Sequence, residues 1–511
     1  MADIVLVNPN ISTLRGKKKG TSLNVEPPLG LVCMGTYLKK QGFSVKIIDA
    51  LVDDTEAEIK KNIDGALFVG LSTMSSQISH ALEIAGLVRR LNPNLPIVWG
   101  GMHPTLFPEQ TLRDPLADFI ITKEGEETAV ELANSIEGGG REFSGIRGMG
   151  YKEAGKCRMN GERPFFDLNK MPFLDWGLMD IGQYIKTEID GKIYDSMYIH
   201  SSRGCPSRCA FCINTILNRR MWRSMPAERV LDEIGHLVEK HKINNVWFRE
   251  ENFFASRGRA KEICRGIKAR GLDITWLTTV RADYFGPGFL DDGFVKLLKD
   301  SGCIRLSMGI ESGSQKILNY IKKDESPRNA LASARLCNRH GIKPVFSFMT
   351  GLPTESREDT METIELIKKL KRLAPNCDII GPQIFRPYPG SEIYDWCKKN
   401  GFEEPDSLRG WTDPKVLMET GFVSATKLPW IKEPDFTSLI SMSVPYAFNM
   451  GVKDALFCGS IQKAALSFSA KLRSFFNYWE LPFEKRVFDA VYKRKSGKSC
   501  HNPLTSESVF E

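Results

Sequence analysis

The chain has 511 residues, of which 42% are hydrophobic and 26% charged, a balance typical of a soluble globular protein with more than one domain. Its net charge of +8 is modest for this length and does not predict DNA as a partner. No stretch approaches the roughly 20 apolar residues that span a bilayer, and the first residues lack the basic start of a signal peptide, so we expect a cytoplasmic protein without a transmembrane segment.

Strand and helix patterns alternate from residue 2 to about residue 137. The expected strands are Ile4–Val7, Val45–Ile48, Ala66–Leu71, Ile97–Trp99 and Asp118–Ile121. The expected helices between them are Leu29–Lys40, Glu56–Ile63, Ile78–Leu91 and Thr128–Ile136. This order predicts a doubly wound, Rossmann-like α/β domain over residues 1–140, whose ligand lies beyond the carboxyl ends of the strands.

After the glycines at 138–140, residues 141–195 are polar and contain Pro164 and Pro172, which is typical of a linker with a short hairpin. A second strand–helix series then predicts a partial (β/α)6 TIM barrel over residues 196–395. Its expected strands are Met197–His200, Asn245–Arg249, Ile274–Val280, Ile304–Met308, Pro344–Met349 and Ile379–Phe385. Residues 396–511 hold aromatic-rich helical stretches at Phe436–Met450, Ile461–Tyr478 and Glu484–Tyr492, and they predict a C-terminal helical cap.

Most of the 12 cysteines are scattered, and in a chain without an export signal we expect reduced thiols. Cys205, Cys209 and Cys212 differ because they form a C-x3-C-x2-C motif directly after the first strand of the barrel. Such thiolates suit zinc or an iron–sulfur cluster. Structural zinc takes four protein ligands, and neither His200 nor His236 has the spacing that completes such a site. A [4Fe–4S] cluster held by three cysteines has one iron open for another ligand, which favours a catalytic cluster over zinc or unrelated buried thiols.

The motif, its place after the first barrel strand and the aromatic residue before its third cysteine resemble the radical S-adenosylmethionine (SAM) superfamily. Further segments match that family in order after successive strands, namely Trp247–Phe253, Thr279–Asp283, Gly309–Gly313, Gly351–Glu355 and Arg386–Gly390. The resemblance implies that SAM binds the open iron and is cleaved to methionine and a 5′-deoxyadenosyl radical. The SAM contacts that it implies are Phe211, Glu250, Arg281, Glu311, Ser312 and Tyr388.

With its preceding domain, the chain resembles radical SAM enzymes that carry an N-terminal cobalamin (B12)-binding domain, over roughly residues 2–395. The implied cobalamin contacts are Asn8, Leu29, Gly30, Ser72, Thr73, Gly100, Gly101, His103, Gly125 and Glu126. The Asp-x-His-x-x-Gly string of base-off cobalamin domains is absent, so we interpret His103 as a loop or corrin contact rather than a cobalt ligand. A nucleotide-binding Rossmann domain is the rival interpretation, but neither G-x-G-x-x-G nor G-x4-G-K-[ST] follows a strand here.

The resemblance implies a class B radical SAM methyltransferase that methylates an unactivated sp3 carbon through the 5′-deoxyadenosyl radical and methylcobalamin. It also implies anaerobic chemistry and an electron donor such as ferredoxin or flavodoxin. The alternatives are a cobalamin-dependent cyclase or rearrangement enzyme without methyl transfer, and a non-catalytic cobalamin- or zinc-binding module. For the substrate we expect a peptide or protein residue such as glutamine, because the end of the chain is basic, although small molecules are equally compatible.

Overall fold

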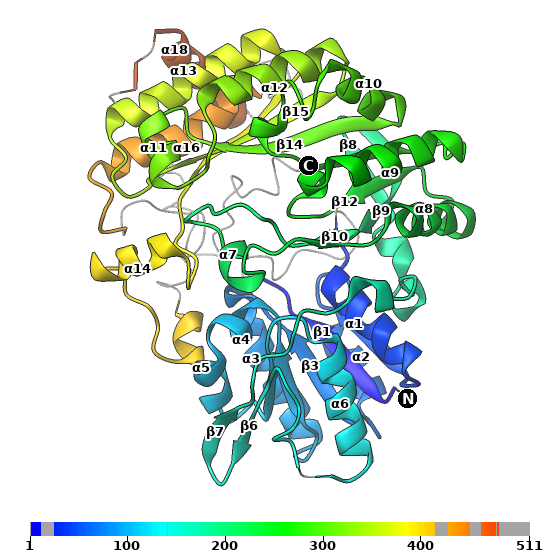
Figure 1. Ribbon diagram of the computed structural model, residues 1–511. Helices are drawn as coiled ribbons and strands as arrows, with labels where there is room; N and C mark the ends of the chain where they lie inside the picture. Colours follow the sequence, from blue (N-terminus) through cyan, green and yellow to red (C-terminus); the bar gives the residue numbers. More distant parts are fainter. Residues whose placement is uncertain are drawn as a thin grey trace. The chain divides into compact units, whose positions relative to one another are not determined.

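The structure is a computed structural model that describes residues 2–11, 25–140, 142–413, 428–449, 461–476, 478 and 479. Over these residues the chain divides into two compact units, drawn in Figure 1. The first unit joins Met1–Tyr198 to Glu404–Gly421, and the second joins Ile199–Glu403 to Phe422–Glu511. The basic end of the chain and the helical stretch expected at 484–492 lie outside the described residues.

The sheet of the first unit runs in the order β2-β1-β3-β4-β5-β6-β7, and β1 to β5 are parallel. These strands are β1 (Ile4–Asn8), β2 (Val45–Asp49), β3 (Phe68–Ser72), β4 (Ile97–Gly100) and β5 (Phe119–Ile121). Residues 4–7 are all buried, because a central parallel strand is covered on both of its faces. The expected doubly wound order is therefore confirmed.

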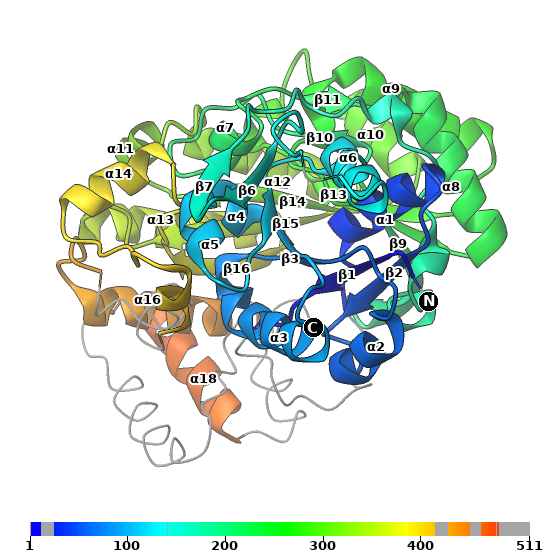
Figure 2. The same ribbon diagram turned by 90° about the horizontal axis from the view of Figure 1, so that it is seen from below.

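Helices cover both faces of this sheet, as the view in Figure 2 shows, with α1 and α6 on one face and α2 and α3 on the other. They are α1 (Leu29–Lys40), α2 (Thr55–Asn62), α3 (Ile78–Leu91), α4 (Met102–Leu106), α5 (Pro108–Arg113) and α6 (Glu126–Glu137). Helix α2 begins where it does because the Asp54 carboxylate accepts a hydrogen bond from the backbone N–H of Ala57.

Residues 142–185 continue the first unit, and the two strands that follow them join the second sheet. The antiparallel hairpin β6 (Met149–Glu153) and β7 (Lys156–Met159) extends the sheet beyond β5. Short 3-10 turns follow at η3 (Leu168–Lys170), η4 (Trp176–Leu178) and η5 (Ile181–Gln183). Trp176 is buried, and the Tyr184 hydroxyl donates a hydrogen bond of 2.8 Å to the buried Asp49 carboxylate. Much of the polar stretch expected as a linker thus packs against the domain before it.

The second sheet runs in the order β16-β15-β14-β13-β12-β9-β8, and the strands from β12 to β16 pair in parallel. The strands are β8 (Lys186–Ile189), β9 (Lys192–Ile199), β12 (Asn245–Phe248), β13 (Thr275–Thr279), β14 (Cys303–Glu311), β15 (Lys343–Thr350) and β16 (Asp378–Ile384). Each strand expected for the partial barrel is present, and the partial-barrel prediction is confirmed.

Helices follow the barrel strands on the outside of the sheet (Figure 1). They are α8 (Ala227–His241), α9 (Arg257–Ala269), α10 (Asp292–Asp300), α11 (Gln315–Tyr320), α12 (Pro327–Arg339), α13 (Arg357–Leu373) and α14 (Glu392–Lys399). Near the C-terminus, α16 (Pro434–Phe448) packs on β16 and α18 (Ile461–Phe476) packs on α16, which confirms a helical C-terminal part. Within the described residues, no helix is both long and apolar enough to cross a bilayer.

Candidate functional site

The three cysteines lie in a loop between β10 (Ser202–Arg203) and α7 (Asn214–Leu217), after the carboxyl end of β9. The loop starts at Gly204, whose φ is +92° and where an added Cβ would lie 2.0 Å from the Met221 carbonyl oxygen, so a side chain is excluded there. Backbone hydrogen bonds from Ala210 to Ile321 and from Ile393 to Ala210, of 2.9 and 3.2 Å, attach the loop to neighbouring elements. Gly204 and these two backbone hydrogen bonds therefore fix the backbone of the cysteine loop.

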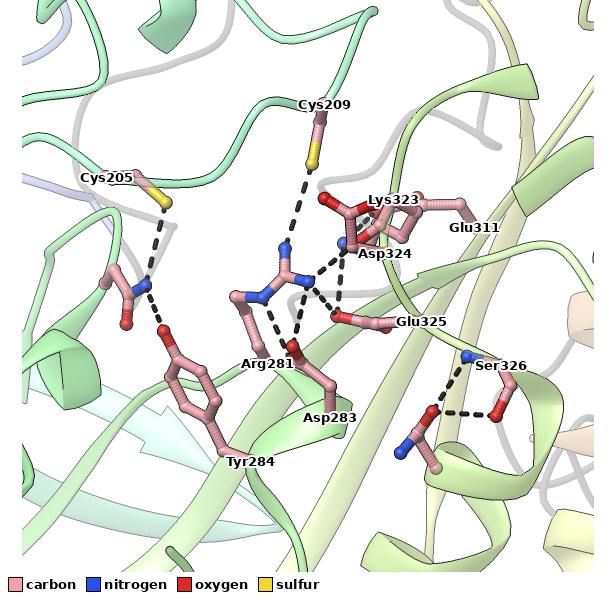
Figure 3. Close-up of polar contacts among 12 residues, drawn as sticks. Cys205, Cys209, Arg281, Asp283, Tyr284, Glu311, Lys323, Asp324, Glu325 and Ser326 are labelled. Carbon is pink, nitrogen blue, oxygen red and sulfur yellow. Dashed lines mark hydrogen bonds and ion pairs between the residues drawn. The ribbon is translucent and has the colours of Figure 1, made fainter. Parts of the chain in front are cut away.

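The thiols are free, and each of two contacts a nitrogen (Figure 3). Asn252 Nδ2 lies 3.6 Å from Cys205 Sγ, and Arg281 Nη1 lies 3.8 Å from Cys209 Sγ. Burial raises the pKa of Cys209, and it raises the pKa of Cys212 to about 11 with the help of the other two thiols. These thiols are therefore protonated at neutral pH unless a metal displaces the protons.

In the part of the chain that the structure describes, no three His, Cys, Asp or Glu side chains converge in the arrangement of a metal site. The donor set is nevertheless that of an iron–sulfur cluster, since three soft thiols are carried on one fixed loop. Their neighbours Asn252 and Arg281 are hydrogen-bond donors, which suits thiolate or sulfide acceptors. The residues present fit a cluster, and the role of Cys205, Cys209 and Cys212 as its ligands stays a prediction.

A buried group of charges lies beside Cys209 (Figure 3). Arg281 forms ion pairs with Asp283 (3.0 Å) and Glu325 (3.2 Å), and it donates a 2.7 Å hydrogen bond to the Lys323 carbonyl oxygen. Lys323 Nζ lies 3.3 Å from Glu311 Oε1. Glu311 has a φ of +68°, a left-handed conformation that is strained for a residue with a side chain. The group thus holds both signs of charge in a largely buried place, which suits a zwitterionic ligand.

Burial dominates the protonation of this group. It raises the pKa of Glu325 to about 7, although Lys323 and Arg281 oppose the shift. Burial lowers the pKa of Lys323, but Glu311 and Glu325 more than offset this and raise it above its ordinary value. Lys323 and Glu325 were missed in the sequence because they follow the short helix α11 rather than a strand end, and the string Lys-Lys-Asp-Glu resembles a solvated turn.

The other expected SAM contacts are placed differently. Glu250 is buried, and its carboxylate accepts hydrogen bonds from the Ser201 backbone N–H (2.7 Å) and from the hydroxyls of Ser201 and Ser202. Ser312 is fully buried, 3.2 Å from the Thr363 hydroxyl. Phe211 is half-buried against an apolar cluster, and Tyr388 is exposed. The structure thus gathers Arg281 and Glu311 beside Cys209, and a SAM contact by any of the six residues stays a prediction.

The carboxyl edge of the first sheet is closed by loops that contact each other through backbone atoms. Thr73 N–H donates to the Gly100 carbonyl (2.8 Å), and His103 N–H donates to the Thr73 carbonyl (2.9 Å). Gly101 has a φ of +92°, and a Cβ there would lie 2.7 Å from the Thr73 nitrogen. A Cβ on Gly125 would lie 2.7 Å from Ile121. The loops after β3 and β4 therefore require glycine for their close approach.

The remaining expected cobalamin contacts lie at the ends of the same strands and helices. Asn8 Nδ2 donates a 2.9 Å hydrogen bond to Asp49, and Ser72 is half-buried at the end of β3. Leu29 and Glu126 are buried in the first turns of α1 and α6. Gly30 has open space where a Cβ would stand, with no described atom within 4 Å. These residues thus lie at the carboxyl edge of the first sheet, and their contact with cobalamin stays a prediction.

His103 is the most unusual residue of this edge. It is 0% exposed, and its Nδ1 lies 3.0 Å from the Ser75 hydroxyl oxygen. Its Nε2 is buried and has no hydrogen-bond partner among the described residues. Burial lowers the pKa of His103 to about 3, so the imidazole is neutral at physiological pH. A buried polar atom without a partner fits a ligand with a polar periphery, as cobalamin has.

Comparisons with known proteins identify both domains. Residues 199–367 match the family model described as the radical SAM superfamily, and residues 19–133 match that of the B12-binding domain. Uncharacterized methyltransferase PH0819 of Pyrococcus horikoshii is 32% identical over 422 residues, which cover 81% of this chain and 87% of that protein.

More distant relatives extend the comparison. An anaerobic magnesium-protoporphyrin IX monomethyl ester cyclase of Synechocystis sp. is 26% identical over 412 residues, or 80% of each chain. Among solved structures, the cobalamin-dependent S-adenosylmethionine radical enzyme OxsB superposes with a TM-score of 0.70 at 19% identity, over 98% of this chain and 76% of that one. At this identity the superposition shows a shared fold.

Proposed function

Because this chain belongs to the radical SAM superfamily, among the enzymes that carry a B12-binding domain ahead of the barrel, we propose that it is a methyltransferase acting on an unactivated sp3 carbon. The observation that carries this proposal is the similarity to a relative named a methyltransferase, which extends over 81% of the chain and so includes both domains. An unactivated carbon is a poor nucleophile, and this explains why a methyltransferase would need radical chemistry.

The cofactors of this enzyme are SAM, a [4Fe–4S] cluster and cobalamin. When bound, the cluster and SAM supply a 5′-deoxyadenosyl radical, and cobalamin supplies the methyl group. We assign Cys205, Cys209 and Cys212 as the ligands of the cluster, and ferredoxin or flavodoxin as the class of electron donor. An oxygen-sensitive cluster is consistent with an anaerobic, cytoplasmic enzyme.

The residues of the barrel would orient SAM through charge. Arg281 is held by Asp283 and the Lys323 carbonyl, so its guanidinium is preorganised beside Cys209 to pair with the SAM carboxylate. Glu311, at the end of β14, supplies the opposite charge for the SAM ammonium. In the first unit, the backbone of Gly100 and Gly101 and the side chain of His103 would contact cobalamin.

A second candidate function is cyclisation or rearrangement without methyl transfer, because the cyclase of Synechocystis sp. is similar over 80% of this chain. A peptide or protein residue such as glutamine remains our prediction for the substrate. The basic residues that suggested it, at 485–486 and 493–495, lie outside the described part of the chain.

One anaerobic assay separates these functions. The reconstituted full chain is incubated with SAM, a reductant, cobalamin and candidate substrates, and the products are quantified by chromatography and mass spectrometry. S-adenosylhomocysteine and 5′-deoxyadenosine formed together with a methylated product support methyl transfer. Deoxyadenosine without S-adenosylhomocysteine favours the second candidate. Neither product, from protein that has its cluster and binds cobalamin, contradicts both functions and favours a binding module.

A further inference from the structure

The domain at the N-terminus is completed by residues from far along the chain. The 3-10 turn η8 (Leu408–Thr412) packs on α3, and Leu408 and Trp411 belong to the apolar core of the first unit. In Figure 1 this segment lies beside α5. Trp411 is 3% exposed, although it lies in a polar stretch of sequence. Burying its indole removes a large apolar surface from water, so the contact is part of the folded unit.

Polar contacts fix how this segment sits on α5 and the residues after it. The Trp411 indole N–H donates to Gln110 Oε1 (2.7 Å), and the Gln110 amide donates to the Pro405 carbonyl (2.7 Å). Arg409 donates to both carboxylate oxygens of the buried Asp114, at 2.8 and 3.3 Å. Although the Arg409 side chain is 58% exposed, its two-point contact to the buried carboxylate is specific in geometry. Trp411 therefore has one defined position.

In that position Trp411 contacts His103. The indole and imidazole centroids are 5.3 Å apart at an interplanar angle of 81°, an edge-to-face contact. The Phe107 ring contacts both of them, with its centroid 5.1 Å from that of His103 and 5.0 Å from that of Trp411. Because Ser75 also holds Nδ1, the imidazole has little freedom to rotate. The nitrogen without a partner, Nε2, is thus held in one place by residues that are about 300 positions apart in sequence.

We infer that Trp411 is a positioning residue of the cobalamin site, which holds the His103 imidazole so that its Nε2 meets the cofactor. Cobalamin then supplies the hydrogen-bond partner that Nε2 lacks, and the cobalamin domain includes residues 405–413 as well as the first sheet and its helices. The inference rests on the proposed function through the assignment of cobalamin to this unit. Cobalamin has many peripheral amide groups, and a neutral imidazole is a suitable partner for them.

The test is a double-mutant cycle in the full chain, with hydroxocobalamin as the probe and the Kd measured by equilibrium dialysis. We expect Trp411→Ala and His103→Ala each to weaken binding about tenfold, the scale of one misplaced buried hydrogen-bonding group. Because Trp411 acts through His103, the double variant should bind no more weakly than His103→Ala alone. Trp411→Phe, which keeps an aromatic ring against His103, should restore most of the affinity.

Controls separate positioning from general damage. Trp430→Ala removes a tryptophan of the second unit whose indole donates to the Gly351 carbonyl, and it should leave the Kd unchanged. Where Trp411→Ala does not fold, as judged by thermal unfolding, Trp411→Leu takes its place in the cycle because it retains apolar volume without a ring. The inference is overturned if Trp411→Ala weakens hydroxocobalamin binding equally in the presence and absence of His103. It is also overturned if the Kd of Trp411→Ala is within twofold of the wild-type value. Wild-type protein that does not bind hydroxocobalamin contradicts instead the cofactor assignment beneath it.

Discussion

Glu250 is a predicted SAM contact, but its surroundings in the structure indicate that it anchors the cysteine loop, and this role can be tested. The structure surrounds this buried carboxylate with three donors, the Ser201 N–H and the hydroxyls of Ser201 and Ser202, and with the nearby charge of Arg259. Arg259 in turn donates to the Ser201 carbonyl (2.9 Å) and the Met225 carbonyl (2.7 Å). Glu250 thus anchors the chain just before the cysteine loop, and Glu250→Ala should loosen that loop.

The expected magnitude follows from these contacts. A hydrogen bond to a charged group is worth about 1.5–3 kcal/mol, and leaving a buried charge without its partner costs about 3–5 kcal/mol. Because the three donors share one carboxylate, their effects do not add, and we expect Glu250→Ala to destabilise the loop by about 3–5 kcal/mol. A loss of about 3 kcal/mol raises the population of the open loop roughly 150-fold.

The assay is hydrogen–deuterium exchange of the cofactor-free protein, followed by mass spectrometry of a peptide that spans residues 201–212. Glu251→Ala is the matched control, because Glu251 is exposed and accepts one hydrogen bond from the Gly204 N–H (3.1 Å). Exchange of the peptide should accelerate far more in Glu250→Ala than in Glu251→Ala. If the two variants exchange within threefold of each other, Glu250 does not anchor the loop, and a direct contact with SAM becomes the better explanation.

Three further predictions concern separate parts of the chain. Cys209→Ala should abolish 5′-deoxyadenosine formation and lower the iron and sulfide content, while cobalamin binding persists. The control variant Cys264→Ala, which changes a buried cysteine outside the motif, should keep its cluster. Loss of cobalamin binding in Cys209→Ala would argue against two separate sites. Gly101→Ala should destabilise the first unit by about 1–3 kcal/mol, because a side chain at φ +92° is strained and its Cβ would meet Thr73. Gly30→Ala should not destabilise the unit, because space is open there. Equal melting temperatures of the two variants would contradict this prediction. Burial raises the pKa of Glu355 to about 7 from an ordinary 4.5. The folded state therefore gains about 3 kcal/mol of stability when Glu355 is protonated; this gain is complete below pH 4.5 and is lost as the pH rises through 7. Glu355→Gln should flatten the rise in urea midpoint on going from pH 7 to pH 5, and an unchanged slope would show that Glu355 is ionised throughout.

Much of the fold could be predicted because its signals are local. Runs such as Ile4–Val7 are apolar on both faces, and the order of strands and helices then leaves few topologies for a parallel sheet. The cysteine loop was equally readable, since its spacing lies within eight residues. Glycines at the strand ends marked the edge of the first sheet because a close backbone approach excludes other residues.

Contacts between distant segments could not be predicted from the sequence. Nothing in the residues around Trp411 names His103 as a neighbour, because a single tryptophan in a polar stretch has no periodicity. Lys323 and Glu325 likewise become buried only when their turn folds beside Arg281. The adjacent Glu250 and Glu251 have the same chemistry, and only the path of the loop after β12 decides that the first is buried and the second exposed.

The return of residues 405–413 to the first unit has a consequence for synthesis on the ribosome. At about 5–20 residues per second, the roughly 200 residues between 198 and 404 take on the order of 10–40 seconds to translate. Throughout that interval the nascent domain lacks Leu408 and Trp411, so α3 and its neighbours expose apolar surface to water. A chaperone, or the folding barrel itself, then has a surface to protect, and the first domain reaches its final stability only after most of the chain has emerged.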